Sequence, residues 1–380
     1  MHPTRTRGRI AALAVAAATT VTVLTALPPA RAQTVGQLRV GENYRLGDPP
    51  AARVRDTPGL VANPADRTQL VHVQKDTLAQ DCNAYYSTDA GATWTGGGLA
   101  PPPDYPQPGS PVTLPSCPSF EGSVNWGTGN NVYTAVGIAK TVGGPNRIIV
   151  HRSVDAGRTW TPTVAMEEAA SAGAPKIRVH AGAGAGGADR VFVASLVSNR
   201  PRVAVSNNSG VNWNPSVEVS GLAGTPTRNI AEITDPVVYP NGQVALGYRI
   251  PDAQVTGQPA PVESTIQVAR TASAFPLPGA AGWAKADVTR VRGYVDESGA
   301  RFNGSNFPEM DNDPASPNLY MVYMEGPPPG GRQDHFIHPD VDTMFTRSTD
   351  GGATWSAPKR INDDPPGSGA PARGPAQRHP

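Results

Sequence analysis

The chain has 380 residues, which is long enough for one large domain or two ordinary ones. Its 32 lysines and arginines nearly balance 31 aspartates and glutamates, so the formal net charge is +1. Such a chain lacks the positive surface potential that would attract nucleic acids or anionic membranes. We therefore expect neither as a partner. Glycine and proline number 41 each, which indicates many turns, while the valine, isoleucine and aromatic runs between them argue against disorder.

The N-terminal segment has the pattern of an export signal. Three arginines precede an apolar stretch, Ile10–Leu27, and residues 30–32 read Ala-Arg-Ala, the small-x-small form of a cleavage site. We therefore expect a signal peptide over residues 1–32 and a secreted, extracellular chain. The apolar stretch is also nearly long enough to span a bilayer, so an uncleaved anchor is the alternative. No other segment is apolar enough to cross a membrane.

Beyond residue 32, short runs of alternating or β-branched residues, separated by turn residues, predict strands along the chain. No stretch there has convincing helical periodicity. The expected strands of the first three groups are Pro58–Ala62, Gln69–Gln74, Ala84–Ser87 and a short run after Trp94; Phe120–Trp126, Asn131–Ile138, Arg147–Arg152 and Pro162–Met166; and Lys176–His180, Arg190–Val197, Arg202–Ser206 and Ser216–Val219. Those of the last two groups are Pro236–Tyr239, Gln243–Tyr248, Thr265–Ala269 and Lys285–Val291, then Phe307–Asp311, Leu319–Met324, Asp342–Arg347 and Ala357–Asn362.

One eight-residue pattern, Ser-x-Asp-x-Gly-x-Thr-Trp, recurs between the third and fourth strands of these groups. The residues that define its clean copies are Ser87, Asp89, Gly91 and Trp94; Ser153, Asp155, Gly157 and Trp160; and Ser348, Asp350, Gly352 and Trp355. A weaker copy, Ser206–Trp213, has asparagine in place of the aspartate and of the threonine. In a decayed copy, Thr271–Trp283, only the preceding strand and the closing tryptophan remain.

The chemistry of the pattern predicts a tight turn between antiparallel strands. The aspartate carboxylate accepts hydrogen bonds from nearby backbone N–H groups, and the glycine adopts positive φ without steric cost. The tryptophan is a large anchor that packs between neighbouring units. Self-similarity at a period of several tens of residues, with strands only, is typical of a β-propeller.

The pattern resembles the Asp-box, or BNR repeat, of the sialidase superfamily and of sortilin-like propellers, over nearly the whole mature chain. The resemblance implies an all-β fold, a β-propeller of four-stranded antiparallel blades with Asp-box turns, over residues 33–364. In that family the Asp boxes lie at the rim, away from the catalytic centre, so the repeat predicts the fold and not the activity.

Five blades are visible, whereas sialidase-type rings usually hold six, so we expect an incomplete propeller. The Pro/Gly-rich tail, residues 365–380, is interpreted as the start of a truncated further blade, because Gln377–Pro380 resembles the approach to an inner strand. Two alternatives stay open. Val35–Leu46 covers part of the gap as an N-terminal strand, or five blades close alone, since propellers run from four to eight blades.

Two cysteines, Cys82 and Cys117, lie at the entrances of adjoining predicted blades. An exported protein meets an oxidising compartment, so we expect a disulfide between them. Two free thiols are the alternative.

The predicted strand order places the first-to-second turns and the Asp boxes on one face and the remaining connections on the other. The long, irregular connections are nearly all on that second face, at residues 96–119, 251–264, 292–306 and 326–340. Loops on a rigid scaffold usually carry function, so we expect a ligand site on the loop-rich face, around the central mouth of the ring.

The resemblance also implies which residues a sialidase-type hydrolase would need. These are arginines that bind the substrate carboxylate, an acid/base carboxylate, and a tyrosine nucleophile backed by glutamate. The aromatic-Arg-Ile-Pro motif of the family lies on the first blade, but here Tyr248-Arg249-Ile250-Pro251 ends a strand of the fourth, and the first-blade region has only Tyr44-Arg45-Leu46. The candidate catalytic residues are Arg249, Arg292, Tyr294, Asp296, Arg301 and Glu309. The alternatives are an ordinary strand end for Arg249 and a solvated loop for the others.

No cofactor or metal is expected. Asp334–Asp340 contains two histidines among carboxylates, but a proline-rich loop without a third cluster is a poor metal site. Residues 182–184 read Gly-Ala-Gly, yet no helix follows to bind a dinucleotide.

Three functional hypotheses from different classes follow. The first is a secreted, monomeric propeller that binds an extracellular glycan or protein through its loop-rich face. The second is an exo-acting glycoside hydrolase of sialidase type, and the third is a cell-surface structural scaffold. The misplaced arginine motif favours the first, because function depends on the site and not on the fold.

Overall fold

The computed structural model describes residues 55–76, 81–103, 117, 119–139, 146–168, 172–222, 230, 232–252, 263–271, 273, 275–292, 308–326 and 342–362. The expected signal peptide and the C-terminal tail lie outside these ranges. Within them the chain forms strands and two short 3₁₀ turns, Ala185–Gly187 and Ala280–Gly282. Among the described residues, no helix has the length and apolarity that a membrane span requires.

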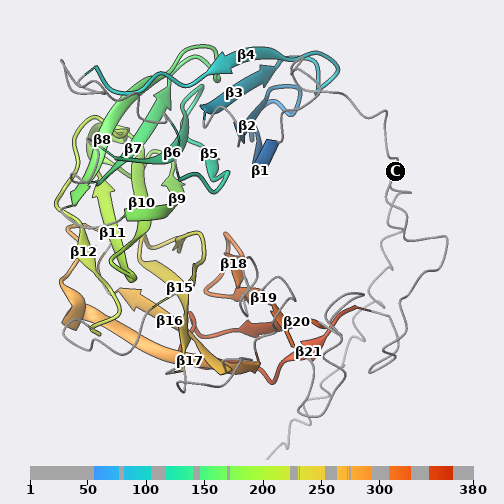
Figure 1. The fold of residues 1–380 in the computed structure, drawn as a ribbon, viewed down its shortest axis with the longest axis vertical. Coiled ribbons are helices and arrows are strands. Elements are labelled where there is room, and N and C mark those ends of the chain that lie inside the picture. The colour runs from blue at the N-terminus through green and yellow to red at the C-terminus, as the bar shows by residue number, and fades with distance from the viewer. Residues whose placement is uncertain are drawn as a thin grey trace, which may run out of the picture. The chain divides into compact units, whose positions relative to one another are not determined.

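The strands form five antiparallel sheets that follow one another along the chain (Figure 1). The first sheet contains β1 (Arg55–Ala62), β2 (Leu70–Asp76), β3 (Asp81–Ser87) and β4 (Thr95–Gly98); the second contains β5 (Val124–Trp126), β6 (Val132–Ala139), β7 (Asn146–Ser153) and β8 (Thr161–Glu168). The third contains β9 (Ala172–His180), β10 (Arg190–Val197), β11 (Arg200–Ser206) and β12 (Val217–Glu218). In the fourth, β13 (Glu232–Ile233) and β14 (Val237–Val238) both pair with β15 (Val244–Pro251), followed by β16 (Glu263–Thr271) and β17 (Trp283–Arg292). The fifth contains β18 (Glu309–Asn312), β19 (Leu319–Glu325), β20 (Asp342–Ser348) and β21 (Lys359–Arg360).

These sheets are the blades of a β-propeller, and they confirm the all-β class and the predicted four-strand grouping. The first strand of the fourth blade differs from the prediction, because it is split into β13 and β14. Pro236 in the break has no N–H group to donate to β15. The break leaves Asp235 outside the ladder, which matters for the site described below.

Four buried hydrophobic clusters lie between sheets that are neighbours in chain order. The second strands β6, β10 and β15 are therefore buried on both faces. β19 differs, because Leu319, Met321 and Tyr323 are buried against the fourth sheet while Tyr320 and Val322 remain 37% and 36% exposed. One face of β19 is therefore buried against the fourth sheet, whereas described residues bury the opposite face of β19 less. The number of blades stays a prediction.

The first Asp box shows how the repeated pattern builds its turn. The Ser87 hydroxyl donates to Asp89 (2.7 Å) and accepts the N–H of Gly91 (2.8 Å). The Asp89 carboxylate accepts the N–H (2.9 Å) and the hydroxyl (2.6 Å) of Thr93, which lower the pKa of Asp89 to about 2. The Trp94 indole N–H donates to the Gly91 carbonyl at 2.9 Å. The same serine–aspartate–threonine bonds recur in the second and fifth blades.

The weaker copy in the third blade keeps this geometry with an amide. Asn208 accepts the N–H of Asn212 at 2.9 Å, and the Ser206 hydroxyl accepts the N–H of Gly210 at 2.9 Å. In all four boxes, the residue after the aspartate, or after Asn208 in the weaker copy, also has positive φ, a feature that the sequence pattern does not reveal. This residue is Ala90, Ala156, Ser209 or Gly351, with φ of 60°, 60°, 58° and 69°.

Each of the first three boxes is hydrogen-bonded to the first-to-second turn of its own blade. The bonds run from the N–H of Ala90 to Thr68, of Ala156 to Asn130 and of Ser209 to Asp189, each at 2.9 Å. The boxes and these turns therefore share one face of each blade, as predicted.

Cys82 and Cys117 form the expected disulfide, with their Cα atoms 5.4 Å apart. Both residues are buried in the hydrophobic cluster between the first and second sheets. The bond links the third strand of the first blade to the segment that leads into the second.

Candidate functional site

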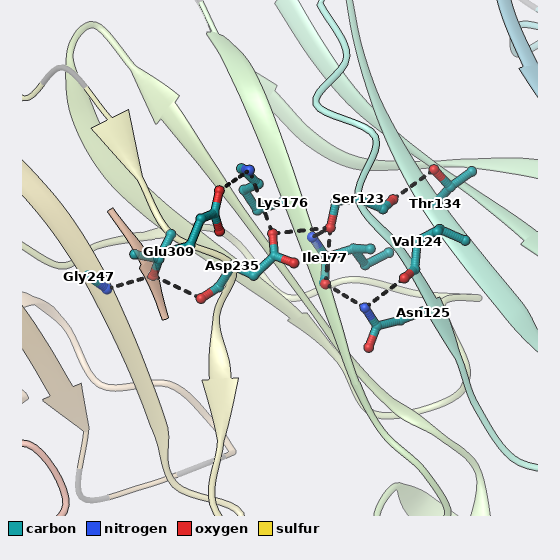
Figure 2. A network of polar contacts seen from close by, with 10 residues as sticks. Ser123, Val124, Asn125, Thr134, Lys176, Ile177, Asp235, Gly247 and Glu309 are labelled. Atoms are coloured by element: carbon teal, nitrogen blue, oxygen red, sulfur yellow. Dashed lines mark hydrogen bonds and ion pairs between the residues drawn. The ribbon is translucent and has the colours of Figure 1, made fainter. Parts of the chain in front are cut away.

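Polar side chains from the first strands of several blades converge on Lys176 (Figure 2). Its ammonium nitrogen on β9 lies 3.9 Å from Oδ1 of Asp235 and 3.6 Å from Oε1 of Glu309. Asp235 occupies the break between β13 and β14, and Glu309 begins β18. The third, fourth and fifth blades thus each contribute one charged group to the same point.

A second charge pair lies two residues further along the same two strands. Arg178 on β9 binds Asp311 on β18 and donates to the Asn312 side chain at 3.1 Å. Alternate residues of a strand point to the same face, which explains why Lys176 and Arg178 match Glu309 and Asp311. These contacts join the third and fifth blades, which are not neighbours in chain order, so the first strands face a shared interior space. We call the five charged residues Lys176, Arg178, Asp235, Glu309 and Asp311 the inner-strand cluster.

The second blade holds Asp235 in position through Ser123. The Ser123 hydroxyl lies 3.3 Å from Oδ1 of Asp235 and accepts the N–H of Ile177 at 2.8 Å (Figure 2). On the other side, the hydroxyl of Thr234 donates to the Asp235 carbonyl at 2.9 Å and accepts the N–H of Gly247 at 3.0 Å. A Cβ atom at Gly247 would lie 2.7 Å from Cγ2 of Thr234, so this close approach requires glycine. The backbone of Asp235 is therefore fixed before any ligand arrives.

Burial changes the acidity of both carboxyl groups. It raises the pKa of Asp235, against the opposing charges of Lys176 and Arg178. Burial also raises the pKa of Glu309, where Lys176 opposes the shift and the charge of Asp235 adds to it. The Asp235 side chain is 30% exposed and that of Glu309 is 56% exposed, so Asp235 is the better shielded. Two carboxyl groups that hold protons more tightly than usual next to one ammonium are equipped for hydrogen bonding or proton transfer.

The cluster borders a pocket of about 350 Å³. Its lining residues are Arg178, Asp235, Glu309, Met310, Asp311, Tyr320 and Val322. The Tyr320 ring stacks on Phe345 at a centroid distance of 6.3 Å. The pocket thus combines charged hydrogen-bonding groups with an aromatic face.

The structure places three of the six candidate catalytic residues. Glu309 belongs to the inner-strand cluster. Arg249 is buried on β15, where it contacts Glu232 at 2.7 Å and donates to the Ser264 hydroxyl at 2.9 Å. Arg292 ends β17 and contacts Glu325 at 3.1 Å. The contacts described for these three residues do not overlap.

The other candidates, Tyr294, Asp296 and Arg301, lie outside the described residues, as does the histidine-containing loop 334–340. Within the described ranges, no group of three or more His, Cys, Asp or Glu side chains has the arrangement of a metal site. The catalytic roles of the six candidates stay predictions.

The predicted site residues did not include Lys176, Arg178, Asp235 and Asp311, because the ligand site was expected on the long loops. A usable signal was present, since two cations and two anions alternate with apolar residues on two predicted first strands. Aligning the first strands of the blades would have placed Lys176 and Arg178 opposite Glu309 and Asp311.

A comparison with known protein families supports the repeat. A family model described as BNR/Asp-box repeat matches residues 85–95. No curated protein matches the chain. Similar solved structures include a Penicillium chrysogenum alpha-L-arabinanase complexed with arabinobiose, at 18% identity, TM-score 0.45, and coverage of 81% of this chain and 82% of that one. An alpha-L-arabinofuranosidase from Fusarium graminearum has 11% identity and TM-score 0.48, with coverage of 82% and 83%.

A Hadza microbial sialidase has 15% identity and TM-score 0.42, with coverage of 81% of this chain and 59% of the other. At these identities and TM-scores, the likeness does not bear on activity. The assignment of the fold therefore rests on the Asp-box repeat and on the antiparallel blades. By its Asp boxes and its antiparallel blades, the chain is a β-propeller that carries BNR/Asp-box repeats.

Proposed function

We propose that this chain is an extracellular propeller that binds an uncharged glycan at the inner-strand cluster. The observation that carries the proposal is the convergence of Lys176, Asp235 and Glu309, from three blades, beside a pocket with an aromatic wall. Sugar-sized ligands usually occupy concave pockets in which a few fixed polar groups set the orientation. Carboxylates and cations offer acceptors and donors for sugar hydroxyls, and the Tyr320 ring offers a flat surface for the C–H face of a pyranose or furanose.

The charge of the cluster selects among glycans. Lys176 and Arg178 face three carboxyl groups, and Glu121 adds a further negative charge near Glu309. A ligand with its own carboxylate would be repelled unless Lys176 and Arg178 were released from their present partners. A neutral oligosaccharide meets no such barrier, which argues against a sialoside at this point.

Binding measurements on the purified chain test the proposal. A panel of neutral oligosaccharides and sialosides is screened, and any hit is measured by calorimetry against Glu309→Gln and Asp311→Asn. Loss of one charge-assisted hydrogen bond, worth about 1.5–3 kcal/mol, predicts about a tenfold or greater rise in Kd. Glu167→Gln, which changes a carboxylate on the outer strand β8, is the matched control and leaves Kd unchanged. Hits confined to sialosides, or equal Kd values in all variants, would refute the proposal.

A second candidate function, glycoside hydrolysis, is favoured by the carboxyl pair Asp235 and Glu309. Glycosidases use two carboxyl groups, of which one donates a proton to the leaving oxygen and the other assists attack at the sugar carbon. The raised pKa values suit the proton donor. If the chain hydrolyses glycans, Asp235→Asn and Glu309→Gln should stop release from aryl glycosides of neutral sugars.

Two other results discriminate between the enzyme hypotheses. Release from a fluorogenic sialoside that depends on Arg249 and Arg292 would favour a sialidase-type site on the loop-rich face. No release from any substrate would remove both hydrolase hypotheses and leave the binding function.

A further inference from the structure

A second cavity, of about 490 Å³, lies between the fourth and fifth blades on the Asp-box face. Its walls come from the turn after β14, the end of β16, the start of β17, the β18–β19 turn and the fifth-blade Asp box. The cavity borders the fourth-blade turn, where the Asp box has decayed. It shares no lining residue with the pocket of the inner-strand cluster.

The wall of this cavity contains a guanidinium group that forms no ion pair with any residue in the described ranges. Arg270, which is half-buried, makes one long hydrogen bond, from Nη1 to the carbonyl of Gly351 at 3.3 Å. Its Nε atom is buried and has no acceptor among the described residues, which also contain no carboxylate in an ion pair with it. A planar, partly desolvated guanidinium is best satisfied by two oxygens of one carboxylate.

Asp350, the one acid among the described lining residues, does not fill this role. Both Asp350 oxygens are occupied inside its own Asp box, by the Ser348 hydroxyl, the N–H groups of Ala353 and Thr354, and the Thr354 hydroxyl. These bonds hold the pKa of Asp350 well below its usual range, with the Thr354 hydroxyl as the largest cause. Asp350 is therefore committed to the turn, and Arg270 is left for a ligand.

The rest of the wall has the character of a sugar subsite. Pro240, Ala284 and Pro317 provide apolar surface. Asn241 and Ser316 add polar surface, and each is held in place by hydrogen bonds within its own turn, to Gln243 and Asp313. The Tyr239 hydroxyl donates to the Gly351 carbonyl at 2.8 Å, which keeps its ring in the wall. A ring with one apolar face, several hydroxyls and one carboxylate matches these groups.

We propose that this cavity binds a hexuronic acid, with the sugar carboxylate on Arg270 and the ring against the proline and alanine side chains. The ligand is distinct from the neutral glycan of the inner-strand cluster. A polysaccharide that contains both kinds of sugar would supply ligands for both sites.

Calorimetry or ligand-observed NMR on the full chain tests the proposal, with glucuronate, galacturonate, glucose, galactose and acetate as probes. We expect a uronate to bind about tenfold or more tightly than the matching neutral sugar, because the carboxylate adds a charge-assisted pair. Arg270→Gln should remove this preference. Arg347→Gln is the matched control, because Arg347 precedes the fifth-blade Asp box as Arg270 precedes the fourth, but is exposed and outside the cavity.

A second variant protects the test against misfolding. Ala284 is exposed at the wall, so Ala284→Phe should fill the cavity and abolish uronate binding while the melting temperature stays near that of the parent chain. Equal affinity for uronate and neutral sugar, no uronate binding, or unchanged binding in Arg270→Gln would each overturn the proposal. Acetate that binds as tightly as glucuronate would overturn the sugar assignment. Glu309→Gln should leave uronate binding intact, which separates this proposal from the glycan site of the inner-strand cluster.

Discussion

Ser153→Ala tests whether the Asp box stabilises the blade through its buried serine. The Ser153 hydroxyl is buried, accepts the N–H of Gly157 at 2.8 Å and donates to Asp155 at 2.7 Å. Alanine leaves the Gly157 N–H, in a buried residue, without its acceptor, and an unsatisfied buried donor costs about 1–3 kcal/mol. Asp155 is partly exposed to solvent, so loss of the hydrogen bond from the Ser153 hydroxyl to its carboxylate adds little after solvent screening.

We therefore expect Ser153→Ala to lower the free energy of unfolding by about 2 kcal/mol, or the melting temperature by about 4 °C. Thermal unfolding followed by circular dichroism measures the shift. Thr88→Ala is the control, since Thr88 is an exposed residue within the first box and should change stability by less than about 0.5 kcal/mol. If Ser153→Ala has the same melting temperature as Thr88→Ala, the hydrogen bonds of the box do not stabilise the blade and the reasoning is wrong.

Three further predictions concern stability. Ala90→Gly should raise the free energy of unfolding by about 0.5 kcal/mol and so raise the melting temperature slightly. The reason is that Ala90 is exposed and has a φ of 60°, which glycine adopts without strain. A lower melting temperature would contradict this prediction. Replacing Cys82 and Cys117 by alanine should cost about 3–4 kcal/mol, since the disulfide closes a separation of 35 residues, and reductant should then no longer change the melting temperature. His151 is buried and its pKa is lowered to about 4 by burial, so the unfolded chain binds the proton first. Stability should fall as pH drops from about 6.5 to about 4, and His151→Gln should flatten that slope in denaturation curves measured across this range.

The blades could be predicted from the sequence because their signals are local. The turn geometry depends on residues within the same octapeptide, as the contacts of Ser87, Asp89 and Thr93 show. The disulfide was predictable for a similar reason, since the placement of Cys82 and Cys117 followed from the blade register. The split first strand of the fourth blade was missed although Pro236 signalled it.

The inner-strand cluster was not predicted because it depends on contacts between blades. Lys176 and Glu309 are far apart in sequence, and each occupies an ordinary position on an alternating strand. Arg249 lies in a local motif that was interpreted both as a substrate-binding group and as an ordinary strand end, and its role stays a prediction. Glu232 lies directly across from Arg249 in the β13–β15 pairing and binds it, a register that a match of four residues does not contain.

The most direct test of the glycan-binding proposal is a crystal structure of the chain with the tightest neutral oligosaccharide found by screening. We expect a sugar ring against Tyr320, with hydroxyls within hydrogen-bonding distance of Asp235 and Glu309. A sugar bound only elsewhere, with Lys176 still in contact with both carboxylates, would contradict the assignment of the inner-strand cluster as the glycan site.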